Sequence, residues 1–324
     1  MGDFIIGIDI GGSKVLTGIL DKTGRVLTRK KETTCSQGQP GEVMDQVAGM
    51  IELMKDELGI GAQDILGIGA GVPGPLDYYR GVVLESPNLR WPEYPAGSEL
   101  NKRLGSKLLL EKDTNAAALG EFYYGSSKKI RNLIYITVST GIGAGIIADG
   151  NLLHGHKGGA GELGHMLIEP GGRSCGCGRQ GCLEALASGT ALEQEAREMI
   201  AHGQAQSIQA LIGDGKPLTA RELGWAARQG NKEAHDLISR AADFLGIAIT
   251  NLVNLLNPER VVIGGGMGLG LQDLLLPRIK EYVFNHVFRL HRQDLEIAAT
   301  QLGEDIVLLG CATMVLENKQ MFRK

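Results

Sequence analysis

The 324-residue sequence predicts an α/β protein made of two similar lobes with a cleft between them. Three observations carry this prediction. Apolar strands alternate with helices along the chain, and a unit of strand, glycine turn and strand occurs twice, at residues 4–20 and 132–153. The 48 glycines, about twice the usual share of ~7%, lie among hydrophobic runs, where they let the backbone approach a ligand or another backbone.

The first half of the chain accounts for one lobe. Residues 4–10 are apolar enough for a strand buried on both faces, and residues 65–72 form a second such run that ends at a Pro-Gly-Pro breaker. Apolar residues at helical spacing predict a helix over 41–58. The shorter elements expected here are strands at 15–20, 25–30 and 107–111 and a helix that begins near 115.

The second half repeats the pattern. Strands are expected at 132–138, at 146–153 around an Asp-Gly turn, at 260–264 and at 295–299. Helices are expected at 191–202, 220–229, 231–256, 271–284 and 310–318. The stretch between 153 and 189 is rich in Gly, Cys and His, so we expect it to be irregular.

Charge and targeting signals exclude several classes of protein. The chain has 33 basic and 37 acidic residues, a net charge of −4, so it offers no basic field to a nucleic acid. The N-terminal stretch contains Asp3 and Asp9 and no basic segment, which excludes a signal peptide. The most apolar run, 244–256, is too short to span a bilayer. We expect a cytoplasmic protein with no membrane or nucleic-acid partner.

The first glycine turn, in the motif GIDIGG, points to a nucleotide that carries a metal ion. A dinucleotide-binding loop would open a helix, whereas the residues after this loop predict a strand. Asp9 would repel a bare pyrophosphate, but an acid beside phosphates is useful when Mg²⁺ lies between them. Gly11 and Gly12 would let backbone N–H groups approach phosphate oxygens, with Lys14 nearby. For this loop alone, a tight β-hairpin turn is the alternative.

The second turn, in the motif VSTGIGAG, repeats the design with the hydroxyls of Ser139 and Thr140. One such loop could be a simple hairpin. Two of them opening corresponding units favour a pair of phosphate-binding loops.

A cysteine cluster predicts a metal site. One histidine and three cysteines with the spacing H-x9-C-x-C-x4-C supply the closed tetrahedral ligand set that structural Zn²⁺ prefers. These ligands are His165, Cys175, Cys177 and Cys182. A redox pair or surface thiols are the alternative. Cys35 and Cys311 have no partner at ligand spacing and are expected to be small core residues.

Three carboxylates stand among these motifs. Asp113 follows a predicted buried strand, at the sheet edge where ligands of α/β proteins bind. Glu162 precedes the His165 ligand by three residues, and Glu184 follows Cys182 by two. Each alone is more often a helix cap or a solvated charge. Together they describe a polar pocket for a polyhydroxylated ligand, because carboxylates accept hydrogen bonds from sugar hydroxyls.

The motifs together resemble the ROK family of repressors and sugar kinases, which has the actin/hexokinase-like (ribonuclease H-like) ATPase fold. They are DIGGSK, GVPGPLD, SPNLRW, DTNAAALGE, TGIGAGII, GGAGELGHM, CGCGRQGCLE and VVIGGGMG, and they span most of the chain in the family's order. Within the family the sequence is most similar to bacterial glucokinases. This resemblance implies ATP-dependent phosphorylation of glucose at the 6-hydroxyl, with Mg²⁺ bound alongside ATP and a structural Zn²⁺.

The resemblance also implies a role for each matching residue. It assigns the catalytic base to Asp113 and a second, sugar-binding role to His165. The residues implied to bind phosphate and adenosine are Asp9, Gly11, Gly12, Lys14, Thr140, Gly141, Gly264, Gly265 and Gly266. Those implied to contact the sugar are Asn88, Asp113, Glu162, His165 and Glu184.

The sequence departs from the family pattern at Lys112, where an asparagine that contacts the sugar is usual, and at Ser139 and Ala144, which replace frequent glycines. The substrate therefore stays open among glucose, fructose, mannose, N-acetylglucosamine and N-acetylmannosamine, and the phosphoryl donor among ATP, ADP and polyphosphate. A sugar-sensing repressor of the same family is a further alternative. It would need a DNA-binding segment before the first glycine turn, which begins at Gly7.

The resemblance sets the expected domains as well. Residues 1–115 would form a small lobe, completed by the C-terminal helix at about 305–324. Residues 116–304 would form a large lobe that carries the zinc loop. A homodimer or homotetramer is implied.

Overall fold

The computed structural model describes residues 2–35, 39–86, 89–106, 108–125, 130–213 and 215–318. The chain is mixed α/β and divides into two compact units. Unit 1 consists of Met1–Ile130, Gly145–Ala160 and Gln301–Lys324, and unit 2 of Arg131–Ala144 and Gly161–Thr300.

Unit 1 is built on a five-stranded sheet with the order β3-β2-β1-β4-β7. Its strands are β1 (Phe4–Ile10), β2 (Lys14–Asp21), β3 (Val26–Thr33), β4 (Ile65–Val72) and β7 (Leu108–Lys112). The first three are antiparallel neighbours, and β4 and β7 run parallel to β1. A small hairpin, β5 (Leu76–Asp77) and β6 (Val82–Val83), lies apart from this sheet.

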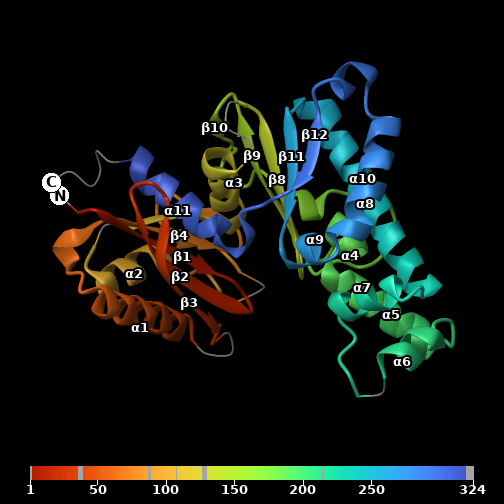
Figure 1. The fold of residues 1–324 in the computed structure, drawn as a ribbon, viewed down its shortest axis with the longest axis horizontal. Coiled ribbons are helices and arrows are strands. Elements are labelled where there is room, and N and C mark those ends of the chain that lie inside the picture. The colour runs from red at the N-terminus through yellow and green to blue at the C-terminus, as the bar shows by residue number, and fades with distance from the viewer. Residues whose placement is uncertain are drawn as a thin grey trace. The chain divides into compact units, whose positions relative to one another are not determined.

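Helices cover both faces of the unit 1 sheet (Figure 1). The alternation of side chains along β1 decides which helix each residue meets. Ile6 and Ile8 pack in one core with α1 (Pro40–Leu58) and α2 (Ala96–Leu104), and Ile5 packs in another with α11 (Ile306–Glu317). The predictions for residues 4–10, 41–58 and 65–72 are confirmed by β1, α1 and β4.

Helix α11 packs closely on α3 (Asp113–Tyr124). A Cβ on Gly310 would lie 1.7 Å from the Ala116 carbonyl oxygen, and one on Gly120 would lie 2.1 Å from the Ile306 carbonyl oxygen. The bounds differ from those expected in two respects. Residues 116–130 and 145–160 fall in unit 1, although residues 116–304 were expected to form the other lobe. Helix α11 begins at Ile306 and not at 310, and Gly310 lies inside it at the contact with α3.

The second five-stranded sheet has the order β10-β9-β8-β11-β12. Its strands are β8 (Leu133–Val138), β9 (Ile142–Ala148), β10 (Asn151–Leu152), β11 (Arg260–Gly264) and β12 (Glu296–Ala299). β8, β11 and β12 are parallel, and β9 carries the chain from unit 2 into unit 1 at Gly145. The predicted strand at 146–153 is therefore two strands joined by the Asp-Gly turn.

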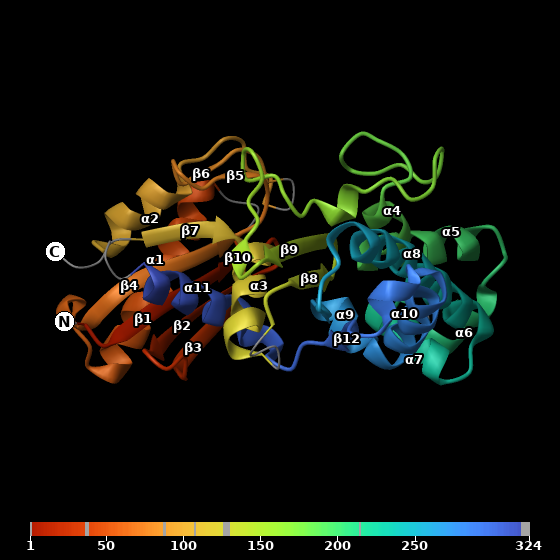
Figure 2. The ribbon, with the colours of Figure 1, turned by 90° about the horizontal axis from the view of Figure 1, so that it is seen from above.

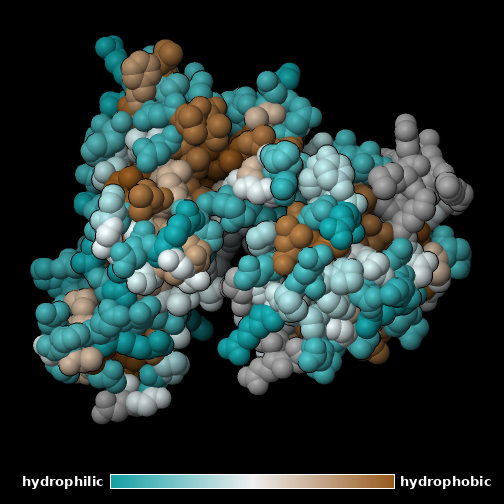
Figure 3. Space-filling model, turned by 180° about the vertical axis from the view of Figure 1, so that it is seen from behind, coloured by the Kyte–Doolittle hydropathy of each residue, from teal (hydrophilic) through white to brown (hydrophobic). Residues whose placement is uncertain are grey.

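Seven helices stand among the described residues of unit 2, and the long α8 packs against α10, α7 and α4 (Figure 2). They are α4 (Leu183–Ala187), α5 (Gly189–Ala201), α6 (Gln206–Ile212), α7 (Ala220–Arg228), α8 (Lys232–Leu256), α9 (Gly266–Gly270) and α10 (Gln272–His286). No helix within the described ranges has the length and apolarity needed to cross a membrane. The face shown in Figure 3 is mostly hydrophilic, with hydrophobic side chains gathered in patches.

Candidate active site

Two carboxylates with predicted roles, Asp9 at the first glycine turn and the expected base Asp113, lie at the carboxyl edge of the unit 1 sheet. Asp9 on β1 is opposite Gly71 on β4, and Gly71 is opposite Glu111 on β7. Asp113 comes directly after β7 as the first residue of α3. Parallel strands that end together bring Asp9 and Asp113 to the same edge, where α/β sheets bind their ligands.

The electrostatics of this edge favour a bound cation. Burial of Asp9, together with the charge of nearby Asp113, raises the pKa of Asp9 to about 7, and Lys14 opposes the shift. Asp113 Oδ1 accepts a hydrogen bond from the Thr114 backbone N–H at 2.7 Å, which orients its carboxylate. A positive ion beside two such carboxylates would relieve their repulsion. The residues present therefore suit the Mg²⁺ that accompanies ATP.

The first glycine turn is a tight β-hairpin in shape. Ile10 pairs with Val15, and the Gly11 N–H donates to the Lys14 carbonyl oxygen at 2.8 Å. The Lys14 amine lies 2.9 Å from Glu304 Oε1, and the Lys31 amine lies 2.8 Å from the same oxygen. These two amines lower the pKa of Glu304 to about 2. The loop is therefore a β-hairpin turn in geometry, which is compatible with a phosphate-binding role.

The two residues before Asp113 are buried and hold a neighbouring segment. Glu111 Oε2 lies 2.7 Å from His154 Nε2, and its Oε1 accepts a hydrogen bond from Asn115 Nδ2 at 2.9 Å. The Lys112 amine donates to the Ala160 carbonyl oxygen at 3.2 Å. The lysine that departs from the family pattern therefore binds backbone of its own unit.

Unit 2 has a cavity of about 410 Å³ in the corresponding place of its own sheet. Thr137 of β8 is opposite Gly264 of β11, so both strands end at this edge. Ser139 and Thr140 of the second glycine turn line the cavity, as does Gly266 at the start of α9. The cavity is large enough for a small-molecule ligand.

Gly264 and Gly265, which the resemblance also places among the nucleotide-binding residues, are needed as glycines for packing. A Cβ on Gly264 would lie 2.1 Å from the Tyr135 hydroxyl oxygen, and one on Gly265 would lie 2.5 Å from the Val138 carbonyl oxygen. Gly265 also has φ of +83°, a conformation that glycine adopts most readily. Gly264 and Gly265 let β11 and the start of α9 approach β8.

Helices α5 and α7 add cavity residues that the sequence analysis missed. The polar ones are Glu193 of α5, Arg221 and Arg228 of α7, and Thr219, which directly precedes α7. They stand far along the chain from either glycine turn and belong to no motif. The one sequence signal for this group is Thr219, a hydroxyl residue that directly precedes the predicted helix at 220–229.

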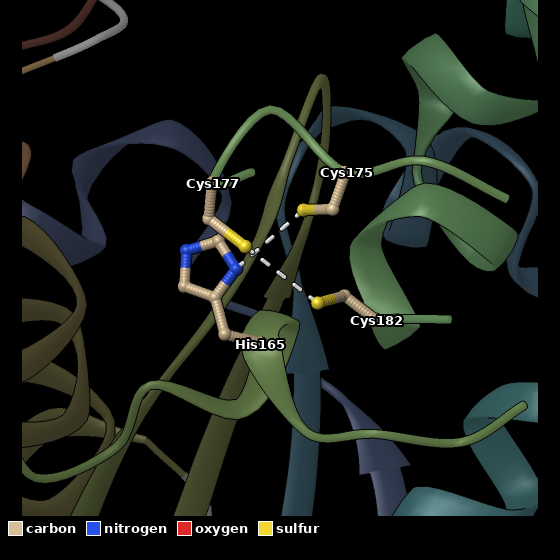
Figure 4. Close-up of side chains that lie close together, drawn as sticks. All are labelled: His165, Cys175, Cys177 and Cys182. Carbon is tan, nitrogen blue, oxygen red and sulfur yellow. Dashed lines mark hydrogen bonds between the residues drawn. The ribbon is translucent and has the colours of Figure 1, made fainter. Parts of the chain in front are cut away.

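The four predicted metal ligands come together in unit 2 (Figure 4). Their ligand atoms all lie within 4.8 Å of one another, and the sulfurs of Cys177 and Cys182 are 3.7 Å apart. Cys175 Sγ is also 3.7 Å from His165 Nδ1. Tetrahedral Zn²⁺ with bonds of about 2.3 Å would separate two sulfurs by about 3.8 Å. Two of the pair distances match this value and the others stay within 4.8 Å, so three thiols and an imidazole here suit Zn²⁺.

The chain around the cluster explains how so short a loop can close. His165 ends the 3₁₀ turn Leu163–His165, and Cys182 immediately precedes α4. A Cβ on Gly181 would lie 1.8 Å from the Glu169 carbonyl oxygen, so only glycine fits there. Hydrogen bonding from Arg179 lowers the pKa of Cys177 to about 6, which favours the thiolate that metals bind.

The carboxylates beside the metal cluster differ in their surroundings. Glu162 is exposed at the start of the 3₁₀ turn. Glu184 lies half-buried in α4, and its Oε2 accepts a hydrogen bond from the Ile142 backbone N–H at 2.8 Å. Asn88, the remaining residue implied to contact the sugar, lies outside the described residues.

Residues 5–318 match the model of the ROK family. The chain belongs to the ROK family. The units described above are those of a protein with the family's actin/hexokinase-like fold.

Relatives of this ROK protein include enzymes and repressors. It is 34% identical to the glucokinase of Thermotoga maritima over 97% of both chains. A structure of a ROK family glucokinase from Streptomyces griseus, in complex with glucose and AMPPNP, matches with a TM-score of 0.83 and 31% identity over 96% of this chain and 98% of that one. The xylose repressor of Caldicellulosiruptor bescii is 31% identical over 98% of this chain and 79% of its own.

Proposed function

We propose that this protein is a glucokinase that transfers the γ-phosphoryl group of ATP to the 6-hydroxyl of D-glucose. The observation that carries the proposal is its similarity to glucokinases over almost the whole length of both chains. The carboxylate pair at the edge of the unit 1 sheet supports the same reaction class.

Asp113 is proposed as the general base. As the 6-oxygen attacks the γ-phosphorus, the bond from that phosphorus to the bridging oxygen of ADP breaks, and the hydroxyl proton passes to the Asp113 carboxylate. The Thr114 N–H, which holds one carboxylate oxygen, keeps the base oriented. The chain contributes mainly by positioning the reactants, because phosphoryl transfer needs little covalent help from a protein.

The nucleotide contacts are proposed for both glycine turns. Gly11, Gly12 and Lys14 would contact phosphate oxygens, and Asp9 would hold Mg²⁺ through water. Thr140 and Gly141 would contact phosphates from unit 2, with adenosine in the 410 Å³ cavity beside Gly264–Gly266. When bound, Mg²⁺ would neutralise charge on the phosphates.

Sugar recognition is proposed for residues with hydrogen-bonding side chains. Glu162, His165 and Glu184 would bind hydroxyls, along with Asn88 and Asp113. Since the Lys112 amine is bound to the Ala160 carbonyl, we propose that Lys112 shapes the choice of hexose indirectly. Fructose, mannose, N-acetylglucosamine and N-acetylmannosamine are the competing substrates.

A coupled kinase assay over these sugars tests the proposal, with ATP, ADP and polyphosphate as donors. We expect the highest kcat/KM with glucose and ATP. A higher value with another sugar would reassign the substrate within the same reaction class. Sugar binding without phosphorylation of any sugar would overturn the kinase function and favour a sugar-sensing role.

The remaining assignments have direct tests. We propose Zn²⁺ as the ion of the Cys/His cluster, with four protein ligands that leave no open position for catalysis. Elemental analysis should find one zinc per chain. We also propose a cytoplasmic homodimer or homotetramer, which cell fractionation and light scattering after size-exclusion chromatography would check.

A further inference from the structure

Glu184 joins the short helix α4 to the second glycine turn. Its Oε2 accepts a hydrogen bond from the Ile142 backbone N–H at 2.8 Å, directly after the turn. A Cβ on Gly141 would lie 2.4 Å from the same oxygen. The carboxylate therefore rests against the backbone of the turn, with no space for a side chain between them.

A second hydrogen bond holds the other side of this turn. The Gly189 N–H donates to the Ser139 carbonyl oxygen at 2.8 Å. The Ser188 N–H in turn donates to the Glu184 carbonyl oxygen at 3.2 Å, so Glu184 and Gly189 belong to one hydrogen-bonded stretch. That stretch binds the turn at both ends.

The same stretch begins at a metal ligand. Cys182 is the residue before α4, two positions before Glu184. The Leu183 N–H donates to the Met166 carbonyl oxygen at 2.9 Å, next to the ligand His165. The metal cluster thus fixes the start of the helix from which Glu184 reaches the turn.

The turn is also part of the cavity wall. Ser139, Thr140 and Gly189 all line the 410 Å³ cavity. All the atoms concerned lie in unit 2. A displacement of α4 would consequently move the wall of the cavity as well as the residues around Glu184.

We propose that Glu184 is a positioning residue for the nucleotide-binding turn, and that the metal loop supports nucleotide binding through it. The inference rests on the proposed function in one respect, namely that the cavity receives ATP. It extends that function, because Glu184 would support nucleotide binding in addition to contacting the sugar, and the metal would support nucleotide binding through Glu184. Hydrogen bonds from backbone N–H groups to a carboxylate are among the strong ones in proteins, so the loss of this one should be measurable.

The test measures binding of Mg²⁺–AMPPNP without sugar, by calorimetry, so that sugar contacts do not contribute. Glu184→Ala should raise the Kd roughly tenfold, while Glu184→Gln, which keeps an oxygen acceptor, should recover most of the affinity. Metal content and Tm are measured for each variant. Gly141→Ala should also weaken AMPPNP binding, since its Cβ would meet the Glu184 carboxylate. Because Gly141 is itself proposed to contact phosphate, this variant serves only to overturn the inference, by binding AMPPNP normally.

Two further variants separate this role from others. Glu195→Ala removes a half-buried carboxylate of α5 that pairs with Arg240 and does not line the cavity, and should leave the AMPPNP Kd unchanged. Glu162→Ala should weaken glucose binding without affecting AMPPNP. Removal of the metal by a chelator should raise the AMPPNP Kd of the wild-type protein but add little to the defect of Glu184→Ala.

A Glu184→Ala protein that keeps its metal and binds AMPPNP within twofold of wild type would overturn the inference. If that variant loses its metal, Glu184→Gln and Gly141→Ala decide, and wild-type affinity in Gly141→Ala would again overturn it. Failure of the proposed function has a different signature, because the wild-type protein itself would then not bind AMPPNP.

Discussion

The two sheets of this protein share one topology and differ in what they carry at the same edge. Each has three strands that follow one another in the sequence and two further strands parallel to the first of them, in the orders β3-β2-β1-β4-β7 and β10-β9-β8-β11-β12. In the first, Asp9 stands opposite Gly71, close to the end of β1. In the second, Thr137 stands opposite Gly264, close to the end of β8. One topology thus presents a carboxylate in unit 1 and a neutral hydroxyl in unit 2.

The two turns are also supported differently. In unit 1, Lys14 of the first turn pairs with Glu304 in an ion pair that is well exposed to solvent. In unit 2, the half-buried Glu184 accepts a backbone hydrogen bond beside the second turn. Exposed ion pairs contribute little to stability, whereas a partly buried hydrogen bond to a charged group contributes more. The repeated topology therefore places a turn at the same edge of each sheet, and the side chains around each turn determine its charge and how firmly it is held.

The strongest test of this contrast is Asp113→Asn at the unit 1 edge. The change keeps size and hydrogen bonding but removes the proton acceptor, so kcat should fall about 10²–10⁴-fold. Glucose KM should change much less. A stopped-flow or coupled assay measures both constants, and a variant with nearly wild-type kcat would mean that another group takes the proton.

A matched pair of substitutions compares the two hairpins directly. Asp9→Asn should lower kcat/KM on the order of 10–100-fold and raise the Mg²⁺ concentration needed for half-maximal rate, because the charge that favours the cation is lost. Thr137→Val, at the corresponding place in unit 2, should change the rate by less than about threefold and leave the Mg²⁺ dependence as it is. Equal effects of the two changes would contradict the division of roles.

Cys177→Ala tests whether the metal loop supports the second glycine turn, in unit 2. Loss of one thiolate should release the metal, loosen the loop between His165 and Cys182, and raise KM for glucose and for ATP by roughly tenfold. The Mg²⁺ requirement, which we assign to Asp9 in unit 1, should not change. Zinc content and both KM values are measured together, and normal kinetics in a protein without metal would show that the ion serves only stability.

The smallest expected effect is a pH-dependent change in stability at Asp9. Burial and Asp113 raise its pKa from 3.8 to about 7. The folded protein therefore favours the protonated form, and the contribution to stability is full below pH 4 and is lost as the pH rises through 7. Asp9→Asn should unfold like wild type near pH 4 and be more stable at pH 8 by about 1 kcal/mol, after allowance for solvent screening.

Urea unfolding at the two pH values, without added Mg²⁺, measures this difference. Glu304→Gln is a useful control. Lys14 and Lys31 lower the pKa of the Glu304 carboxyl from 4.5 to about 2, so its contribution to wild-type stability is present above pH 4.5 and is lost as the pH falls toward 2, which is the opposite trend. Parallel curves for wild type and Asp9→Asn across the range would contradict the raised pKa.

The sequence by itself determined the features whose signals are local. The strands at residues 4–10 and 65–72 and the helix at 41–58 follow from apolar runs and from spacing, which act within a few residues. The Cys/His cluster could be found because three cysteines lie within eight positions of one another. Helix α2 and the β5–β6 hairpin were missed, since elements this short carry little periodicity.

Only the tertiary structure decided which distant side chains meet. Nothing near Lys14 in the sequence indicates Glu304, nothing near Glu111 indicates His154, and nothing near Ile142 indicates Glu184. The cavity residues of α5 and α7 were unpredictable for the same reason. Local propensity and spacing act through neighbouring residues, whereas these contacts depend on how whole helices and strands pack, and packing is set by burial summed over many residues.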